Sequence, residues 1–432
     1  MRPIFSARRQ ELRSIFDRTR NVVLSSALIG VVTGFAVAGL ERVTVEVCFA
    51  AVDGLPLVLA AFAPAIGLAA AAWWLRVPGR GLPPTTADAY LEAFHTGTRL
   101  RLPDMAHRIV ASVATIGSGG ALGPEGPSIY LGAALGSSVQ ARFRRLLPGA
   151  DRNLLLVAGA AAGVATIFKA PATGAVFAIE VPYQDDLARR MLLPALVAGA
   201  SGYLAFAVVN GTDPLFPVHG TPPFELVDLA GAAALGVAAG FGARLFAWML
   251  LTAKRRAAAS HPALRVALAG AVLAALFAGS RGLTGESLTL GTGYQAIAWA
   301  VAPDRSVPLL LAVLALRCLA TTATVAGGGA GGLFVPLVVA GALLGRAVGG
   351  ALHELDTTLF LVIGIAAFLG AGYRVPLAAV MFVAETTGRP GFVVPGLIAA
   401  VAAELVMLRS SVTELQAHPQ PGGEARGGDA PG

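Results

Sequence analysis

Three glycine-rich segments contain the residues whose spacing could bind an anion. They read PGRGLP at 78–83, GSGGALGPEGP at 117–127 and AGGGAGGLFVP at 326–336, and each precedes a helical pattern. Glycine lets the backbone turn tightly, and a helix that begins at such a turn directs its free N–H groups and positive dipole end toward the loop. Three converging helix ends would hold an anion without a full positive charge. The alternative is that the glycines only allow close helix packing.

The second segment carries an ionisable residue, Glu125, amid apolar sequence. Ionisable groups in such surroundings are functional candidates, because burying them is costly. A carboxylate at a helix start is itself an anion, so it would compete with a free anion for the same site. It would occupy the pathway when ionised and leave it when protonated or displaced, which describes a gate and a carrier of protons. The alternative is a capping carboxylate with no part in transport.

The elements that must position these residues are membrane helices. Of the 432 residues, 56% are hydrophobic and 13% charged, against about 25% charged in soluble domains, and the mean hydropathy is +0.71. Runs long enough to cross a bilayer lie at 22–41, 56–76, 190–209, 226–252, 263–278 and 306–326. Glycine and proline break three further pieces, 105–140, 151–182 and 327–385, and such backbone survives at membrane depth only inside protein or along a wet cavity. The sequence therefore predicts an all-α polytopic membrane protein of broken helices.

Basic clusters flank the apolar runs and account for the net charge of +7. The clusters are Arg2, Arg8, Arg9, Arg13, Arg18 and Arg20 before the first run, and Lys254, Arg255 and Arg256 after a later one. Lysine and arginine in short flanking segments mark the cytoplasmic side, which places the N-terminal segment 1–21 in the cytoplasm. We expect membrane lipid, and no nucleic acid, as the partner of this charge. The first twenty residues fit either an amphipathic helix on the membrane surface or a solvated basic tail.

Other chemistries lack the residues they need. Cys48 and Cys318 each lie in an apolar run, which favours packing over a disulfide framework. The six histidines have no metal-ligand spacing, and the chain carries no phosphate-binding lysine loop and no Ser/His/Asp pattern. We therefore expect no metal, no cofactor and no enzyme activity, including that of an intramembrane protease.

The body of the chain contains one pattern twice. At a constant offset of 209, the residues Pro127, Gly132, Leu135 and Gly136 match Pro336, Gly341, Leu344 and Gly345. Further on, KAPATGAVFAIE at 169–180 resembles RVPLAAVMFVAE at 374–385 at an offset of 205, so that Glu180 matches Glu385 and predicts a shared structural role for the pair. These matches indicate transmembrane repeats at 22–210 and 225–415, followed by a disordered tail at 417–432. A transport site is expected where the broken helices of the two halves meet.

These segments resemble the signatures of the CLC family of voltage-gated chloride channels and chloride/proton antiporters. The signatures, written GSGIP, G(K/R)EGP and GGxFxP, are similar to Gly79–Pro83, Gly123–Pro127 and Gly331–Pro336, in the same order. The AVFAIE and MFVAETTG segments also look like the family's, so the resemblance covers roughly residues 25–415. It implies a homodimer in a bacterial inner membrane, with two inverted halves of tilted, broken helices and one anion pathway in each subunit.

Carried over residue by residue, the resemblance assigns the gate to Glu125. The N–H groups of Leu333 and Phe334 match the donors to the family's central anion. The N–H groups of Glu125 and Gly126 match the donors to its outer anion.

The inner part of the predicted site departs from the family. The N–H groups of Gly79 and Arg80 match its inner donors, but Arg80 replaces a serine whose hydroxyl reaches the central anion. Pro124 stands where lysine or arginine is usual and has no N–H to offer. Thr413 takes the place of the tyrosine that closes the inner side of the central site.

The predicted function is conduction of chloride or a similar small inorganic anion through a pathway gated by Glu125. Exchangers of the family commonly carry a second glutamate directly after the position of Glu180, and this chain has Val181 there, as the family's channels do. That difference favours a passive channel. The alternative is a chloride/proton antiporter with an atypical internal proton route, which would make protons the second transported ion.

Overall fold

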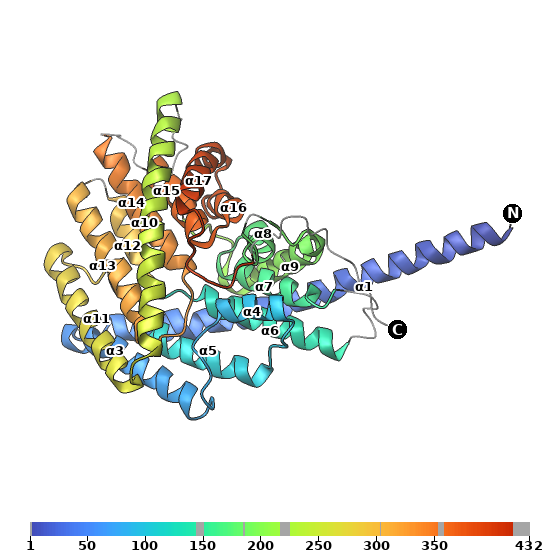
Figure 1. Ribbon diagram of the computed structural model, residues 1–432, viewed down its shortest axis with the longest axis horizontal. Coiled ribbons are helices and arrows are strands. Elements are labelled where there is room, and N and C mark those ends of the chain that lie inside the picture. Colours follow the sequence, from blue (N-terminus) through green and yellow to red (C-terminus); the bar gives the residue numbers. More distant parts are fainter. Residues whose placement is uncertain are drawn as a thin grey trace.

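The computed structural model describes residues 2–143, 151–184, 186–216, 225–302, 304–352 and 358–417, most of them helical (Figure 1). The first half contains α1 (Arg2–Glu41), η1 (Arg42–Phe49), α2 (Ala50–Asp53), α3 (Leu57–Arg76), α4 (Ala87–Thr96), α5 (Leu102–Gly117), α6 (Glu125–Arg142), α7 (Leu154–Ile167), α8 (Pro171–Glu180), η3 (Arg189–Met191) and α9 (Leu192–Asn210). The second half contains α10 (Leu226–Ala258), α11 (Pro262–Thr284), α12 (Tyr294–Val301), α13 (Val307–Ala326), α14 (Phe334–Ala351), α15 (Thr358–Tyr373), α16 (Pro376–Thr387), η4 (Pro390–Phe392) and α17 (Val393–Met407).

Eight helices of the described residues are long and apolar enough to cross a membrane, which confirms the predicted polytopic all-helical fold. Six of them coincide with the predicted apolar runs. The other two are α14, inside the broken piece 327–385, and the span Pro390–Met407, which was not among those runs. The first span, Thr19–Asp53, is longer than its predicted run because the helix continues through η1 and α2.

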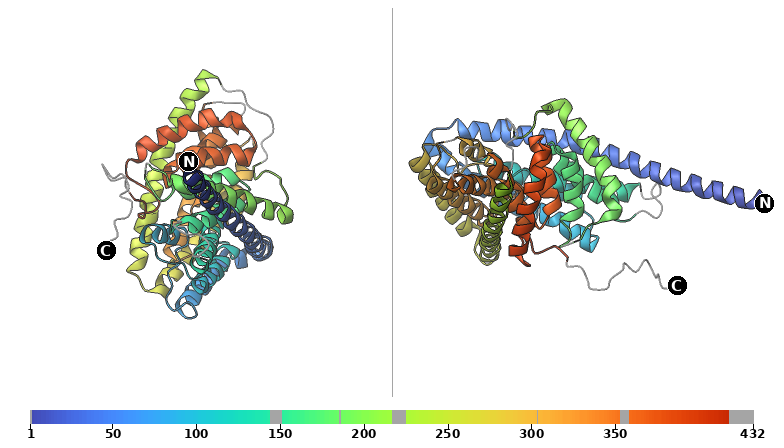
Figure 2. Two further views of the ribbon diagram at one scale, coloured as in Figure 1. Left: turned by 90° about the vertical axis from the view of Figure 1, so that its right-hand side faces the viewer. Right: turned by 90° about the horizontal axis from the view of Figure 1, so that it is seen from above.

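The N-terminal segment is helical and continuous with the first span, since α1 begins at Arg2. Figure 2 shows its first turns extending well beyond the body of the molecule. The side chains of residues 1–18 lie outside the described residues. The two predicted alternatives, a membrane-surface helix and a solvated tail, depend on those side chains. At the other end, Ala417 still pairs with the turn after α8: its N–H donates to Pro182 O (3.0 Å), and its carbonyl accepts from Gln184 N–H (2.9 Å). The rest of the predicted tail, 418–432, lies outside the described residues.

The broken pieces of sequence form short helices buried in protein. Every residue of α7 is buried, and so is nearly every residue of α15. At 14 and 16 residues, these two helices are shorter than the roughly 20 residues that cross a hydrocarbon core. Their ends therefore fall within the protein interior, where other backbone and side-chain groups satisfy their polar atoms.

Equivalent loops of the two halves contact each other reciprocally. Gly123 N–H donates to Gly332 O (3.0 Å), and Gly332 N–H donates to Gly123 O (2.7 Å). Next to them, Ala121 N–H donates to Thr324 Oγ1 and Ala330 N–H donates to Thr115 Oγ1, both at 3.1 Å. Within each pair of hydrogen bonds, adding the offset of 209 to the first-half residue of one bond gives the second-half residue of the other. A self-complementary contact of this kind is what a local two-fold relation produces.

A second reciprocal contact explains the matched glutamates. Glu385 accepts hydrogen bonds from the N–H groups of Ala172 (2.9 Å) and Thr173 (2.7 Å) at the start of α8. Glu180 accepts them from Leu377 (3.1 Å) and Ala378 (2.8 Å) at the start of α16. Each glutamate caps a helix of the other half, which confirms the structural role predicted from their symmetry.

Candidate functional site

The Glu125 carboxylate caps a helix of the other half near the centre of the molecule. Its residue begins α6 directly after Pro124, and its side chain is buried. Oε1 accepts a hydrogen bond from Val335 N–H at 3.1 Å, and Phe334 N–H also faces the carboxylate, so the group lies at the first turn of α14. Oε2 is buried and accepts no hydrogen bond of regular geometry from the described residues. A helix start that holds this carboxylate would equally hold a free anion.

Glycines make room for the Glu125 carboxylate. A Cβ added to Gly123 would lie 1.9 Å from Oε2, and one added to Gly332 would lie 2.2 Å from Oε1. A Cβ on Gly126 would lie 2.8 Å from the backbone of Gly332. All three distances are too short for real atoms. At Gly126 and Gly332, where a Cβ would meet backbone, glycine is required; at Gly123 a Cβ would displace the carboxylate itself.

Aromatic rings surround this helix start. The Phe334 ring packs against Phe168 and Phe382, with ring centroids 4.4 and 5.0 Å apart, and against Phe177 at 5.4 Å. Phe177 in turn contacts Tyr373 edge-on at 5.6 Å. Such a shell excludes water, and electrostatic attraction between the helix start and an anion is stronger in its low dielectric than in water.

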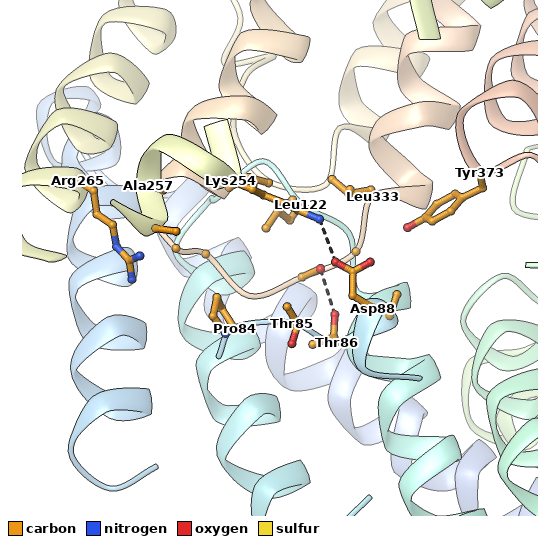
Figure 3. Close-up of a pocket in the computed structure, with 17 residues that line it drawn as sticks. Pro84, Thr85, Thr86, Asp88, Leu122, Lys254, Ala257, Arg265, Leu333 and Tyr373 are labelled. Carbon is orange, nitrogen blue, oxygen red and sulfur yellow. Dashed lines mark hydrogen bonds and ion pairs between the residues drawn. The ribbon is translucent and has the colours of Figure 1, made fainter. Parts of the chain in front are cut away.

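A cavity of about 300 Å³ lies beside the glycine-rich loops (Figure 3). Its lining combines polar and charged side chains with the loop 328–332, and comprises Pro84, Thr85, Thr86, Ala87, Asp88, Leu122, Lys254, Ala257, Ala258, Arg265, Val325, Gly328, Gly329, Gly331, Gly332, Leu333 and Tyr373. Lys254 Nζ lies 2.9 Å from Asp88 Oδ2, and Thr86 Oγ1 donates to Gly331 O at 3.1 Å. The basic end of α10 makes this the cytoplasmic side of the pathway.

The first glycine-rich segment does not supply the expected donors. Gly79 N–H donates to Trp74 O (2.9 Å) and Arg80 N–H donates to Val77 O (3.3 Å), so both groups satisfy carbonyls at the end of α3. The Arg80 side chain is exposed. Since α4 begins only at Ala87, the chain lines the cavity with Pro84–Asp88 instead. The predicted inner-site role of Gly79 and Arg80 does not fit these hydrogen bonds.

The other predicted residues divide into two groups. Gly126, Leu333 and Phe334 lie with Glu125 where α6 and α14 begin, and Leu333 also lines the cavity. Thr413 is buried in the segment that packs against the end of α15, where Val412 N–H donates to Gly372 O (2.9 Å). Its own N–H donates to Ser411 Oγ (3.4 Å), and its Oγ1 accepts from Leu415 N–H (3.3 Å). Its hydroxyl is therefore engaged within its own turn.

The tyrosine of the site is Tyr373, which sequence reasoning missed. It ends α15, its side chain is buried, and it lines the cavity together with Leu333 (Figure 3). The repeat offset of 205 pairs it with Phe168. Of these two equivalent aromatic residues, only Tyr373 carries a hydroxyl. That difference between the halves was the signal in the sequence that could have identified it.

Val181 is buried and carries no polar group toward the site, but two acids held in ion pairs line cavities on the side that the basic end of α10 marks as cytoplasmic. One is Asp88, in the cavity already described. The other is Glu404, whose Oε1 lies 2.8 Å from Arg374 Nη2. That pair lines a smaller cavity of about 240 Å³ together with Glu180 and the exposed Asp186. Sequence reasoning identified neither acid, because both are far from position 181 along the chain.

Comparisons with known proteins agree with this architecture. A family model described as voltage gated chloride channel matches residues 66–408. The H(+)/Cl(-) exchange transporter ClcA of Klebsiella pneumoniae is 30% identical over 311 residues, which cover 69% of this chain and 65% of that protein. Its namesake in Citrobacter koseri is 30% identical over 308 residues, with 69% and 64% covered. The match thus spans just under two thirds of the length of these relatives.

Two solved structures share the fold. A CLC-type fluoride/proton antiporter superposes with a TM-score of 0.79 at 23% identity, over 92% of this chain and 98% of the other. A slow cyanobacterial Cl-/H+ antiporter superposes with a TM-score of 0.78 at 20% identity, over 90% and 94%. Identities this low support the fold and leave the transported ion to be argued from the site.

Proposed function

The chain belongs to the voltage gated chloride channel family, and we propose that it exchanges a small inorganic anion for protons with Glu125 as the moving gate. The observation that carries this proposal is the buried Glu125 carboxylate on the N–H groups that begin α14. The carboxylate takes the place of the transported anion, so the pathway cannot hold both at once.

Protonation of Glu125 is the step that opens the pathway. A neutral carboxyl loses most of its attraction to the positive end of α14, and an anion then replaces it on the same N–H groups. The proton forms an O–H bond with the carboxylate and leaves when the carboxylate returns to the helix start. Oε2, buried without a regular hydrogen bond, is the atom suited to hold that proton.

Exchange is favoured over the passive channel indicated by Val181. Relatives about 30% identical to this chain are named H(+)/Cl(-) exchange transporters, and chloride is accordingly the first anion to test. The chain also carries acids on the cytoplasmic side, Asp88 and Glu404, that could replace a glutamate at position 181. By the same family resemblance we infer a homodimer in a bacterial inner membrane.

The deciding experiment is the reversal potential of the purified protein in liposomes. A pH gradient is applied at fixed chloride on both sides, and the potential at which net ion movement stops is measured. We expect the reversal potential to shift with the pH gradient, because an exchanger couples the two ions. A reversal potential that follows chloride alone would establish the passive channel, and no anion flux at all would reject transport.

A further inference from the structure

We infer that Asp88 and Lys254 form the inner exchange site of the pathway, where an arriving anion takes the place of Asp88 on Lys254 while Asp88 takes up a proton. The inference rests on the proposed proton-coupled function and names the acid and the cation that it requires on the cytoplasmic side. Position 181 offers no such acid, and Glu180 is held by the N–H groups of Leu377 and Ala378.

The ion pair joins the two halves of the protein across a wet cavity. Asp88 lies in the first turn of α4, and Lys254 lies near the end of α10. Their side chains remain 24% and 33% exposed while lining a cavity of about 300 Å³, which has room for water and a small anion. Figure 3 shows the pair on one wall of this cavity. Both ions of the proposed exchange can therefore reach it.

Tyr373 connects this cavity with Glu125. It lines the cavity together with Asp88 and Leu333. Its ring packs on Phe177, which packs on Phe334 at the helix start that holds the Glu125 carboxylate. A tyrosine hydroxyl both donates and accepts hydrogen bonds, so together with cavity water it can pass a proton between the two carboxylates. The step balances: an O–H bond breaks at Asp88, each relaying oxygen gains one proton and releases another, and an O–H bond forms at Glu125.

The charges of the cavity link the proton to the anion. Lys254 and Arg265 contribute two cations, and Asp88 contributes one carboxylate. Arg265 lies against the glycine-rich loop, where a Cβ on Gly328 would be 2.9 Å from its guanidinium. From α5, Arg108 faces the start of α4 by donating to Thr85 O at 2.8 Å. When Asp88 is protonated, Lys254 loses the negative charge of its partner. A small anion that binds beside Lys254 then neutralises the excess positive charge of the cavity.

Glu404 is the rival acid, and the structure gives it another role. Its partner Arg374 also donates to Leu408 O, the carbonyl that follows α17. The guanidinium and Glu404 thereby fix the end of this helix. Glu404 is the matched comparison for Asp88: it is a carboxylate in an ion pair that lines a cavity, but Tyr373 lines the cavity of Asp88 and not that of Glu404.

The test measures anion efflux and proton uptake together in liposomes containing wild type, Asp88→Asn, Lys254→Met, Glu404→Gln or Arg255→Gln. Arg255 is the exposed neighbour of Lys254 and pairs with Glu414. We expect Asp88→Asn to keep its chloride flux and to lose proton uptake per chloride about tenfold, the size of effect that loss of one charged hydrogen-bonding group produces. Lys254→Met should raise the half-saturating chloride concentration about tenfold, for the same reason. Glu404→Gln and Arg255→Gln should keep the wild-type ratio.

The outcomes separate this inference from the proposed function. If the wild type pumps protons and Asp88→Asn pumps them at the same ratio, the inference is wrong and the function stands. The inference is equally wrong if Glu404→Gln loses coupling and Asp88→Asn does not. A wild type that carries chloride without protons overturns both. Should Asp88→Asn not fold, Lys254→Met decides, because an unchanged chloride affinity in that variant contradicts the site.

Discussion

At the scale of single residues, the Glu125 carboxylate occupies the start of α14 where an anion would bind. Glu125→Gln removes its charge and keeps its shape, so the helix start no longer attracts the side chain. We expect chloride flux to persist and to lose most of its dependence on external pH. Flux into liposomes is measured over a range of external pH, with the exposed Glu286→Gln as control. Wild-type pH dependence in Glu125→Gln would show that another group is the gate.

Arg80 was predicted to bind an anion because it matches an inner donor of the family, but the structure places it in a tight turn after α3. It adopts φ +53°, in the left-handed region where residues other than glycine are strained. Arg80→Gly should raise the free energy of unfolding by up to about 1 kcal/mol and leave chloride affinity unchanged.

Thermal unfolding and calorimetric chloride titration check this prediction. Arg76→Gly is the control of opposite sign, because Arg76 is the last helical residue of α3 and glycine lowers helix stability there. A weakened chloride affinity in Arg80→Gly would return Arg80 to the anion pathway.

At the scale of elements, the short helices α8 and α16 depend on glutamates from opposite halves. Glu385 satisfies two N–H groups and the Thr173 hydroxyl (2.6 Å) at the start of α8. Glu385→Ala leaves these donors buried without partners, which should lower the free energy of unfolding by about 1–3 kcal/mol. The proton-to-chloride ratio should not change, because the cap is structural. Thermal unfolding tests the first statement, and paired proton and chloride flux measurements test the second. The exposed Glu286→Ala is the control. An altered proton-to-chloride ratio in Glu385→Ala would give Glu385 a role in coupling.

The sequence identified the helix starts that surround the Glu125 carboxylate but not every residue that lines the neighbouring cavity. Glu125, Gly126 and Phe334 were predicted correctly as neighbours, because loop glycines and helix starts are local features that can be read in order along the chain. The N–H groups of Gly79 and Arg80, which the resemblance assigned to the inner site, instead close the turn after α3, and α4 begins only at Ala87. Tyr373 and Asp88 became visible only in three dimensions, because packing of distant helices brings them to one cavity.

At the scale of the whole molecule, we expect equivalent helices of the two halves to cross the membrane in opposite directions. The first half's α9 follows the basic pair Arg189 and Arg190, which places its start in the cytoplasm. In the second half, Arg255 at the end of α10 pairs with Glu414, so the chain after α17 is also cytoplasmic. The helix α17, which is the counterpart of α9 in the second half, thus ends on the side of the membrane where α9 begins. Together with the reciprocal contacts between the halves, this is the arrangement of an inverted repeat.

Cysteine labelling tests this opposite orientation. In a background without Cys48 and Cys318, Asp213→Cys lies just after α9 and Arg409→Cys just after α17, and both positions are exposed. We expect a membrane-impermeant maleimide added to intact cells to label Asp213→Cys and to leave Arg409→Cys unlabelled until the membrane is opened. Arg256→Cys provides the cytoplasmic reference. Labelling of positions 213 and 409 from the same side would mean that the halves are parallel. It would also remove the basis for calling the Lys254 cavity the cytoplasmic entrance, because that assignment depends on the same basic cluster.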